Sequence, residues 1–250
     1  MREKVIKNVD LNISISEIFS NSHFKNVCNN EVSSFIDIKI EKYKDYFGIN
    51  KNLPRKNILN SFYSYLLDKY RCEYIYKNII TNKILLGRHS INTSTLINEF
   101  RVGSSLADSV FINGESVVYE IKTELDSPDR LYDQINDYQK AFKIIYLVIH
   151  HSQIEKYAKI VKNSSIGLLA LNKRFELSEV KKAKKEVGNL DVTTMFKCLR
   201  KEEYTNIIEK YYNKAPKVPN MLYFKSCLKL AKKIKAIDFH NAMIEELRKR

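Results

Sequence analysis

Three charged residues in the middle of the chain have types and spacing that could do chemistry. Asp108 lies at the start of one predicted strand, and Glu120 and Lys122 end the next. Residues two apart on a strand share a face. Two carboxylates suit a hard divalent cation such as Mg²⁺, which polarises a phosphate and lowers the pKa of a bound water. The lysine can position that water or stabilise charge on phosphorus. The set therefore indicates metal-assisted hydrolysis of a phosphodiester.

The register of the hairpin decides whether the two carboxylates meet. A two-residue turn would pair Asp108 with Tyr119 and point Glu120 to the other side. A three-residue or bulged turn over 113–115 would place Asp108 opposite Glu120. The catalytic interpretation predicts this second geometry, or a bulge elsewhere in the ladder.

The acid-x-Lys pattern alone carries little information, because it begins at Asp37, Glu120 and Glu179. Only the central copy lies on a predicted strand, 12 residues after a strand aspartate and before a helix. That helix is expected to begin at Ser127-Pro128, a capping residue followed by a residue suited to the first turn. The alternative is that the charges form a solvated strand end.

The surrounding periodicity predicts the elements that position these residues. Apolar spacing of three to four predicts helices over 14–48, 55–80, 127–143 and 152–162, and from 173 onward. Short β-rich runs predict strands over 96–102, 107–112, 116–122, 144–149 and 166–171. The first three strands form a meander, whereas helical crossovers favour parallel pairing of the later ones. We predict the α/β class, a mixed β-sheet core flanked by helices.

This central block resembles the PD-(D/E)XK nuclease superfamily, which has the restriction-endonuclease-like fold. Asp108, Glu120 and Lys122 match the motif positions, and the element order is similar. The block also resembles a poorly characterised group of small bacterial members. Ala107 stands where the motif name has proline. The resemblance covers roughly residues 54–172 and implies a nuclease that leaves a 5′-phosphate.

Two residues of the next helix extend the resemblance. Gln134 and Tyr138 are similar to the Gln-x-x-x-Tyr motif of exonuclease-type and RecB-like members. Because they are one helical turn apart, both side chains can reach the same site. In the superfamily such residues orient the substrate or the lysine. The alternative for Tyr138 is a place in the core.

The resemblance also implies further metal ligands. Superfamily members often add a glutamate from the helix before the sheet, and Glu73 is the best match. The alternative is an exposed Glu73 paired with Lys69 or Lys77, each four residues away. The backbone carbonyl of Ile121 is a further ligand implied by the superfamily. The implied cofactor is Mg²⁺ or Mn²⁺.

The charge of the chain favours a polyanionic partner. Its 250 residues contain 43 Lys and Arg against 29 Asp and Glu, a net charge of +14. Most of the excess lies in residues 173–250. Part of it reflects a composition rich in Lys, Asn, Ile and Tyr, which AT-rich coding favours. Nucleic acid is the expected partner, with DNA favoured over RNA.

We predict three parts, a helical N-terminal extension over 1–53, the nuclease-like core over 54–172, and a basic helical C-terminal region over 173–250.

The four scattered cysteines lack Cys-x-x-Cys spacing and indicate free thiols in a reducing cytoplasm. No leader or membrane span is expected. Templates for ATPases, dinucleotide enzymes, zincins and serine hydrolases are absent from the sequence.

Two other functions remain open at this stage. One is a catalytically silent nucleic-acid-binding module that keeps the fold. The other is a subunit of a defence or mobile-element system that acts only with its partner. The sequence does not decide between endonuclease and exonuclease action, although the Gln-x-x-x-Tyr resemblance favours ends or single strands. A protein partner or a homodimer is also undetermined.

Overall fold

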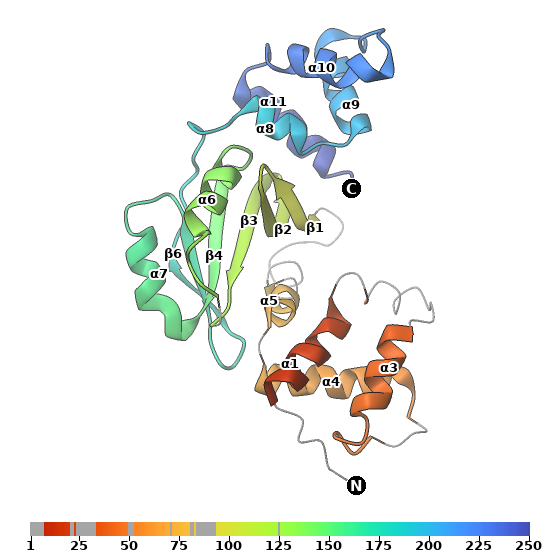
Figure 1. The fold of residues 1–250 in the computed structure, drawn as a ribbon. Helices are drawn as coiled ribbons and strands as arrows, with labels where there is room; N and C mark the ends of the chain where they lie inside the picture. Colours follow the sequence, from red (N-terminus) through yellow and green to blue (C-terminus); the bar gives the residue numbers. More distant parts are fainter. Residues whose placement is uncertain are drawn as a thin grey trace. The chain divides into compact units, whose positions relative to one another are not determined.

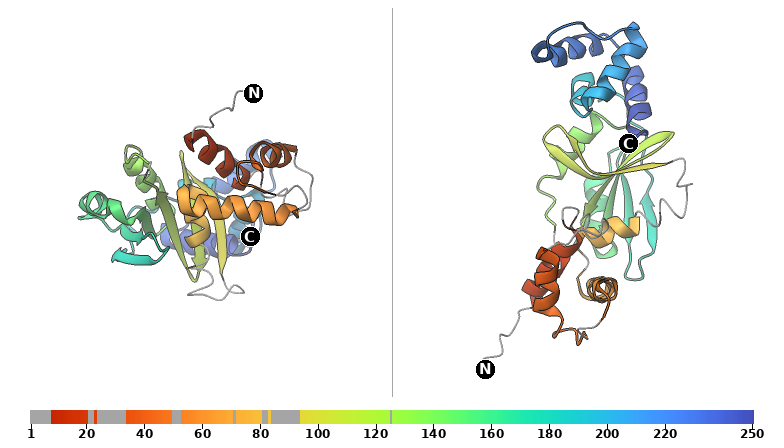
Figure 2. Two further views of the ribbon diagram at one scale, coloured as in Figure 1. Left: turned by 90° about the horizontal axis from the view of Figure 1, so that it is seen from below. Right: turned by 90° about the vertical axis from the view of Figure 1, so that its right-hand side faces the viewer.

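The computed structural model describes residues 8–20, 23, 34–49, 53–70, 72–80, 83, 94–124 and 126–250. The chain divides into two compact units, Met1–Asn78 and Ile79–Arg250. Figures 1 and 2 show their elements. The three-part division expected from sequence stays a prediction.

The first unit is helical. Its elements are α1 (Asn8–Ser16), the 3-10 helix η1 (Glu17–Phe19), α3 (Ser34–Tyr43), α4 (Arg55–Lys69) and most of α5 (Glu73–Ile80). Ile15, Phe62 and Leu66 are buried. The helix expected over 55–80 is two helices, because Tyr70 caps α4 in an extended conformation. Within the range 14–48, where one helix was expected, the described residues form the end of α1, η1 and α3, and residues 21–22 and 24–33 lie outside the described residues.

The second unit contains a six-stranded mixed sheet in the order β1-β2-β3-β4-β5-β6. The strands are β1 (Thr95–Val102), β2 (Ser105–Asn113), β3 (Glu115–Lys122), β4 (Ile144–His150), β5 (Gly167–Leu171) and β6 (Leu177–Lys181). The β1–β3 meander is antiparallel, β3, β4 and β5 are parallel, and β6 is antiparallel to β5. The sheet is twisted (Figure 2). The predicted mixed sheet flanked by helices is confirmed.

The hairpin between β2 and β3 has the register on which the catalytic interpretation depends. Val110 pairs with Val118, and Asn113 pairs with Glu115. Gly114 lies between the last two with φ of +72°, a conformation that a glycine adopts at little cost. The three-residue turn over 113–115 is therefore confirmed.

The sheet is crossed by helices that differ from the prediction at their ends. They are α6 (Leu131–Gln139) and α7 (Ile154–Val161). The helix expected from Ser127 begins at Leu131, because Ser127 Oγ instead accepts a local hydrogen bond from the Asp129 N–H at 3.3 Å. Such side-chain bonds compete with helix formation.

The strand β6 corrects the prediction that the chain is helical from 173 onward. Its residues are mostly exposed and polar, so the apolar alternation that reveals strands is missing. It forms because β5 offers a free edge, and Ser178 and Glu179 pair with Ala170 and Leu169. Charged residues are typical of such edge strands.

The remaining residues form the C-terminal helices α8 (Val192–Lys197), α9 (Lys201–Tyr212), α10 (Asn220–Ala231) and α11 (Ala236–Leu247). They share one hydrophobic core with the sheet and α6, in which Phe142, Leu147, Phe196 and Phe239 are buried. None of the described helices combines the length and the apolar character that crossing a membrane requires. Cys72, Cys198 and Cys227 are free thiols.

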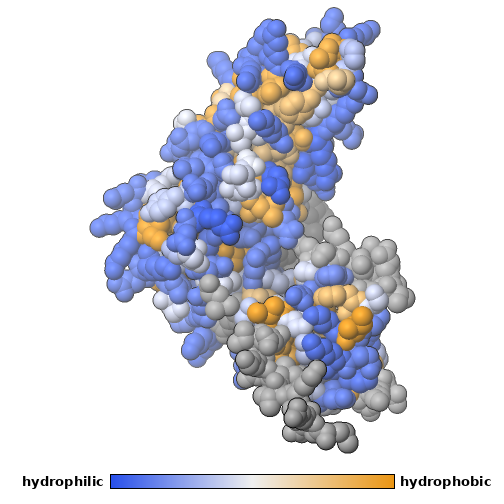
Figure 3. Space-filling view, in the orientation of Figure 1, coloured by the Kyte–Doolittle hydropathy of each residue, from blue (hydrophilic) through white to orange (hydrophobic). Residues whose placement is uncertain are grey.

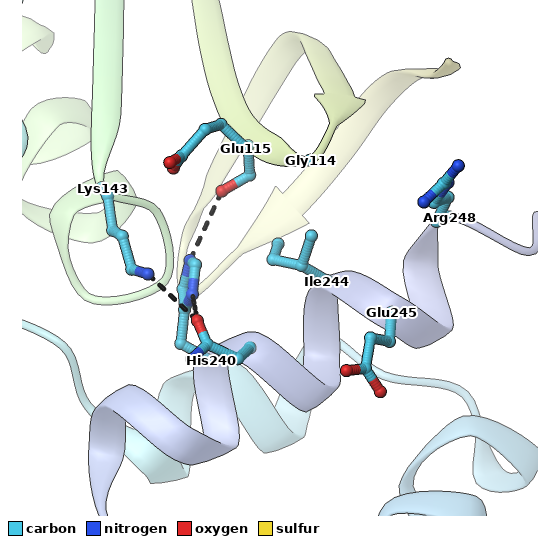
Figure 4. A pocket seen from close by; sticks show the side chains of 9 residues that line it. Gly114, Glu115, Lys143, His240, Ile244, Glu245 and Arg248 are labelled. Atoms are coloured by element: carbon cyan, nitrogen blue, oxygen red, sulfur yellow. Dashed lines mark hydrogen bonds between the residues drawn. The ribbon is translucent and has the colours of Figure 1, made fainter. Parts of the chain in front are cut away.

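The helix α11 lies against the β2–β3 hairpin. Figure 4 shows His240 pointing toward the hairpin, where its Nε2 lies 3.4 Å from Ser116 Oγ. Lys143 Nζ donates to Asn241 Oδ1 at 3.1 Å. Burial, helped by the charge of Lys143, lowers the pKa of His240 to about 4, so the imidazole is neutral at pH 7. A pocket between these groups is also lined by Arg248.

Candidate active site

The end of the β2–β3 ladder positions the two predicted carboxylates. The last paired residues are Ser109 and Tyr119. One residue further in the same register, Asp108 lies opposite Glu120. Asp108 Oδ2 accepts a hydrogen bond from the Ile121 N–H at 2.7 Å. The Asp108 side chain is thus an acceptor for a β3 amide at the point where the backbone pairing stops.

The neighbouring strand also has an irregularity beside Asp108. In the β1–β2 register, Asn98 is opposite Ser109 and Phe100 is opposite Ala107, and the register is interrupted at Glu99 and Asp108 between them. Glu99 has φ of +55°, which is uncommon for a residue with a side chain. Backbone strain of this kind costs on the order of 1 kcal/mol and often accompanies functional sites.

Glu120, Lys122 and Gln134 form a closed triangle of hydrogen bonds. Lys122 Nζ lies 3.0 Å from Glu120 Oε1 and 2.8 Å from Gln134 Oε1. Gln134 Nε2 donates to Glu120 Oε1 at 2.6 Å. Only 2% of Glu120 and 8% of Lys122 is exposed. Because a buried charge is costly without partners, the triangle accounts for how both charges are kept inside the protein.

Tyr138 completes the cluster from the same helix as Gln134. Its hydroxyl oxygen lies 2.8 Å from Glu120 Oε2 and 3.0 Å from the Leu106 carbonyl oxygen, so these two acceptors share one proton. Burial first, and then the charge of Glu120, raise the pKa of Tyr138 far above its ordinary value. Tyr138 therefore remains a neutral donor at any pH at which the protein works.

The structure thus brings together five predicted residues from three elements: Asp108, Glu120, Lys122, Gln134 and Tyr138. We call them the Glu120 cluster. The strands supply the charges, and α6 supplies the two groups that hold them in place. Tyr138 is fully buried and is also hydrogen-bonded to Glu120. It therefore belongs both to the core and to the cluster, the two alternatives that the sequence offered.

The ligand chemistry of the cluster fits a hard cation. Asp108 and Glu120 supply carboxylate oxygens, and Ile121 supplies a backbone carbonyl. Among the described residues no group of three or more His, Cys, Asp or Glu side chains is placed to hold a metal ion. Mg²⁺ needs no such group, since it keeps several waters and is commonly bound through one or two carboxylates and substrate phosphate.

Glu73 has the ion pair that its alternative interpretation predicted. Its Oε1 lies 2.5 Å from Lys77 Nζ, and the Glu73 side chain is half exposed. Glu73 belongs to the first unit and Asp108 to the second. Its role as a ligand stays a prediction.

Two nearby features were missed from the sequence. His150, the last residue of β4, is 3% exposed, and its Nδ1 contacts the Glu124 carboxylate. The signal was its place at the end of a buried strand. Asp137, beside Tyr138, accepts hydrogen bonds from Ser104 and Ser105. No sequence pattern indicates that contact, because 32 or more residues separate the partners.

Comparison with known proteins gives a family and two remote structural likenesses. The model of the family described as bacteriophage P4 protein cII matches residues 67–250. The SPO1766 protein of unknown function from Silicibacter pomeroyi is 14% identical, with 38% of this chain and 63% of that one covered and a TM-score of 0.30. SfsA of Pyrococcus furiosus, solved in complex with Ca²⁺, is 16% identical, with 44% and 62% covered and a TM-score of 0.26.

The chain spans less than two thirds of the length of each of these two structures. No curated protein matches it.

Proposed function

The chain belongs to the bacteriophage P4 protein cII family, and we propose that it is a divalent-metal-dependent nuclease of the PD-(D/E)XK type. The observation that carries the proposal is the Glu120 cluster itself. A lysine ion-paired to one carboxylate, with a second carboxylate one strand away, lies at the end of a β-ladder. The resemblance implied this group, and the hydrogen bonds given above support it.

In this proposal Asp108, Glu120 and the Ile121 carbonyl hold Mg²⁺ or Mn²⁺, with Glu73 as a further candidate. When bound, the cation polarises the phosphate and lowers the pKa of a coordinated water. DNA is the favoured substrate.

Lys122 has the role of positioning the attacking water and stabilising charge on the phosphate. Its Nζ is held by Glu120 and Gln134, which leaves one of its three N–H donors for a water or phosphate oxygen. Gln134 fixes the direction of both charges, since its carbonyl faces the lysine and its amide faces the carboxylate. Tyr138 holds the second oxygen of Glu120.

Cleavage of a mixed panel of plasmid, linear duplex, single-stranded DNA and RNA tests the proposal. We expect cutting with Mg²⁺ or Mn²⁺, none with EDTA, and none by Glu120→Gln under any condition. Cutting by Glu120→Gln at the wild-type rate would place the activity elsewhere. No cutting of any substrate by the wild type would favour a silent binding module or a subunit that needs its partner.

A further inference from the structure

We propose that the outward face of α10 and the loop before it bind the phosphate backbone of nucleic acid, at a distance from the Glu120 cluster. The proposal rests on the proposed function in taking nucleic acid as the substrate. It assigns part of the binding to a surface that takes no part in cleavage. We call this surface the α10 face.

The segment that contains α10 carries charged side chains of positive sign only. Residues 211–237 contain seven lysines and no aspartate or glutamate. All seven are exposed: Lys214, Lys217, Lys225, Lys229, Lys232, Lys233 and Lys235. Within the described part of the chain none of them forms an ion pair. Lys232 does interact electrostatically with Asp191. The charge of these exposed lysines attracts solvent anions, which a polyanion can displace.

Two lysines near this segment, Lys210 and Lys249, are ion-paired. Lys210 Nζ lies 2.5 Å from Glu245 and Lys249 Nζ lies 2.5 Å from Glu246. These ammonium groups already have a carboxylate partner within the C-terminal helices. The α10 face is therefore a local excess of charge and does not simply follow from the basic composition of the chain.

The geometry of α10 directs these charges outward. Cys227 and Ala231 are fully buried on its inner side. Lys225, Lys229 and Lys232 recur at i, i+4 and i+7, which places them on one face of the helix, away from the core. A row of this kind can follow the phosphates of a nucleic-acid strand.

Hydrophobic side chains also reach the surface here. Met221 is 91% exposed and Leu222 52% exposed, and Figure 3 shows hydrophobic residues exposed over the C-terminal helices. A membrane-surface helix would need a broad apolar face directed outward. In α10, Cys227 and Ala231 are packed in the core, and the exposed Met221 and Leu222 share the outward side with lysines. This mixed, cationic face favours a polyanion over a lipid surface.

The α10 face and the Glu120 cluster lie on different elements, and α11, the helix after α10, contacts the end of β3 opposite to Glu120. The C-terminal helices meet the sheet where His240 contacts Ser116, whereas Glu120 is near the other end of the strand. At about 3.3 Å per residue, Glu115 and Glu120 are roughly 16 Å apart along the strand. The end of β3 that α11 contacts is therefore distinct from the end that carries the Glu120 cluster.

Binding measured without cleavage separates this proposal from the proposed function. Fluorescence anisotropy in EDTA, at several salt concentrations, would use a 20-base-pair duplex, a single-stranded DNA, a single-stranded RNA and anionic phospholipid vesicles. The test variant is Lys225→Gln/Lys229→Gln. The matched control, Lys210→Gln/Lys249→Gln, removes the same net charge from the same helical region. Lys225→Arg/Lys229→Arg keeps the charge.

We expect the test variant to reduce the slope of log affinity against log salt by about 1.8 for duplex DNA, which is about 0.9 for each lysine–phosphate contact removed. Doubling the salt concentration would then lower the DNA affinity of the wild type by a factor about 3.5 times larger than that of the variant. The control and the arginine variant should keep the wild-type slope. Equal slopes for the test variant and wild type, preference for vesicles, or no nucleic-acid binding by the wild type would overturn the proposal. If the wild type cleaves no substrate but still binds DNA with a salt dependence that the test variant reduces, only the proposed function would be overturned.

Discussion

The helix α6 contacts two buried carboxylates, and the two differ in the partners that hold them. Asp137, on α6 itself, accepts from the Ser104 N–H and from the hydroxyls of Ser104 and Ser105 at 2.9–3.1 Å. Glu120, on β3, is held by a lysine, an amide and a phenol. The Asp137 partners come from the β1–β2 turn, so that carboxylate fastens the turn to the helix.

The difference shows how a structural carboxylate can be told from a catalytic candidate. Burial acts to raise the pKa of Asp137, but hydrogen bonds from Ser104, Ser105 and Lys140 outweigh it and hold that pKa below its usual value. The lack of a side chain at Gly103 makes room for this carboxylate, because a Cβ there would lie 2.9 Å from the Asp137 carboxyl carbon. Around Glu120 the partners are instead groups that can bind phosphate or water, with a second carboxylate nearby.

Replacing the lysine that pairs with Glu120, and separately the one that pairs with Asp137, should distinguish the catalytic role from the structural one most strongly. Lys122→Ala should reduce metal-dependent cleavage by about 10²–10³-fold, the range for loss of one charge-stabilising donor. Lys140→Ala removes the partner at 3.1 Å from Asp137 and should leave the cleavage rate unchanged. Single-turnover rates at equal folded concentration measure both. An equal loss in the two variants would contradict the distinction.

Asp137→Asn should cost stability and leave catalysis intact. Four donors, the Ser104 N–H, the Ser104 and Ser105 hydroxyls and Lys140 Nζ, lose a charged acceptor. We expect a loss of about 2–3 kcal/mol in the free energy of unfolding. Urea unfolding followed by circular dichroism measures it. A stability equal to that of the wild type would show that the Ser104 and Ser105 contacts do not hold the turn.

The pH dependence of stability should differ between wild type and Asp137→Asn. Because the pKa of Asp137 is held below its usual value of about 3.9 in the folded state, the unfolded chain binds more protons than the folded protein at pH values around and below 4. The contribution of Asp137 is thus complete above about pH 4 and is lost as the pH falls through the folded-state pKa. The stability difference between the two proteins should shrink on acidification from pH 6 to pH 3, and a constant difference would contradict this assignment.

Tyr138→Phe should have the smallest effect. It removes one donor to Glu120 Oε2, while the bonds of Lys122 and Gln134 to Oε1 remain. We expect a loss of about 1 kcal/mol in stability and a kcat about fivefold lower with KM unchanged, the equivalent of about 1 kcal/mol. A loss as large as that of Lys122→Ala would mean that Tyr138 contacts the substrate.

Much of the fold could be predicted because its signals are local. The meander, the buried strands over 144–149 and 166–171, and the hairpin register follow from β-rich runs, Gly114 and the need to place Asp108 opposite Glu120. The strand β6 could not, because its five residues are mostly polar and pair only through their backbone.

The candidate site could be predicted to the level of its residues, through spacing and family resemblance. The structure adds how they are joined, above all the bridging role of the Gln134 amide between Lys122 and Glu120. The Asp137 contacts and the burial of His150 depend on packing between distant segments, which no local pattern records. Catalysis by the Glu120 cluster stays a prediction.

The most direct test of the central claim is the Mg²⁺-dependent cleavage rate of Asp108→Asn beside that of Asp137→Asn. Both substitutions remove one negative charge from a hydrogen-bonded aspartate of the same unit. We predict that Asp108→Asn reduces the rate at least about a hundredfold, since a metal ligand is worth several kcal/mol, and that folded Asp137→Asn cuts at the wild-type rate. Wild-type cleavage by Asp108→Asn would contradict the account.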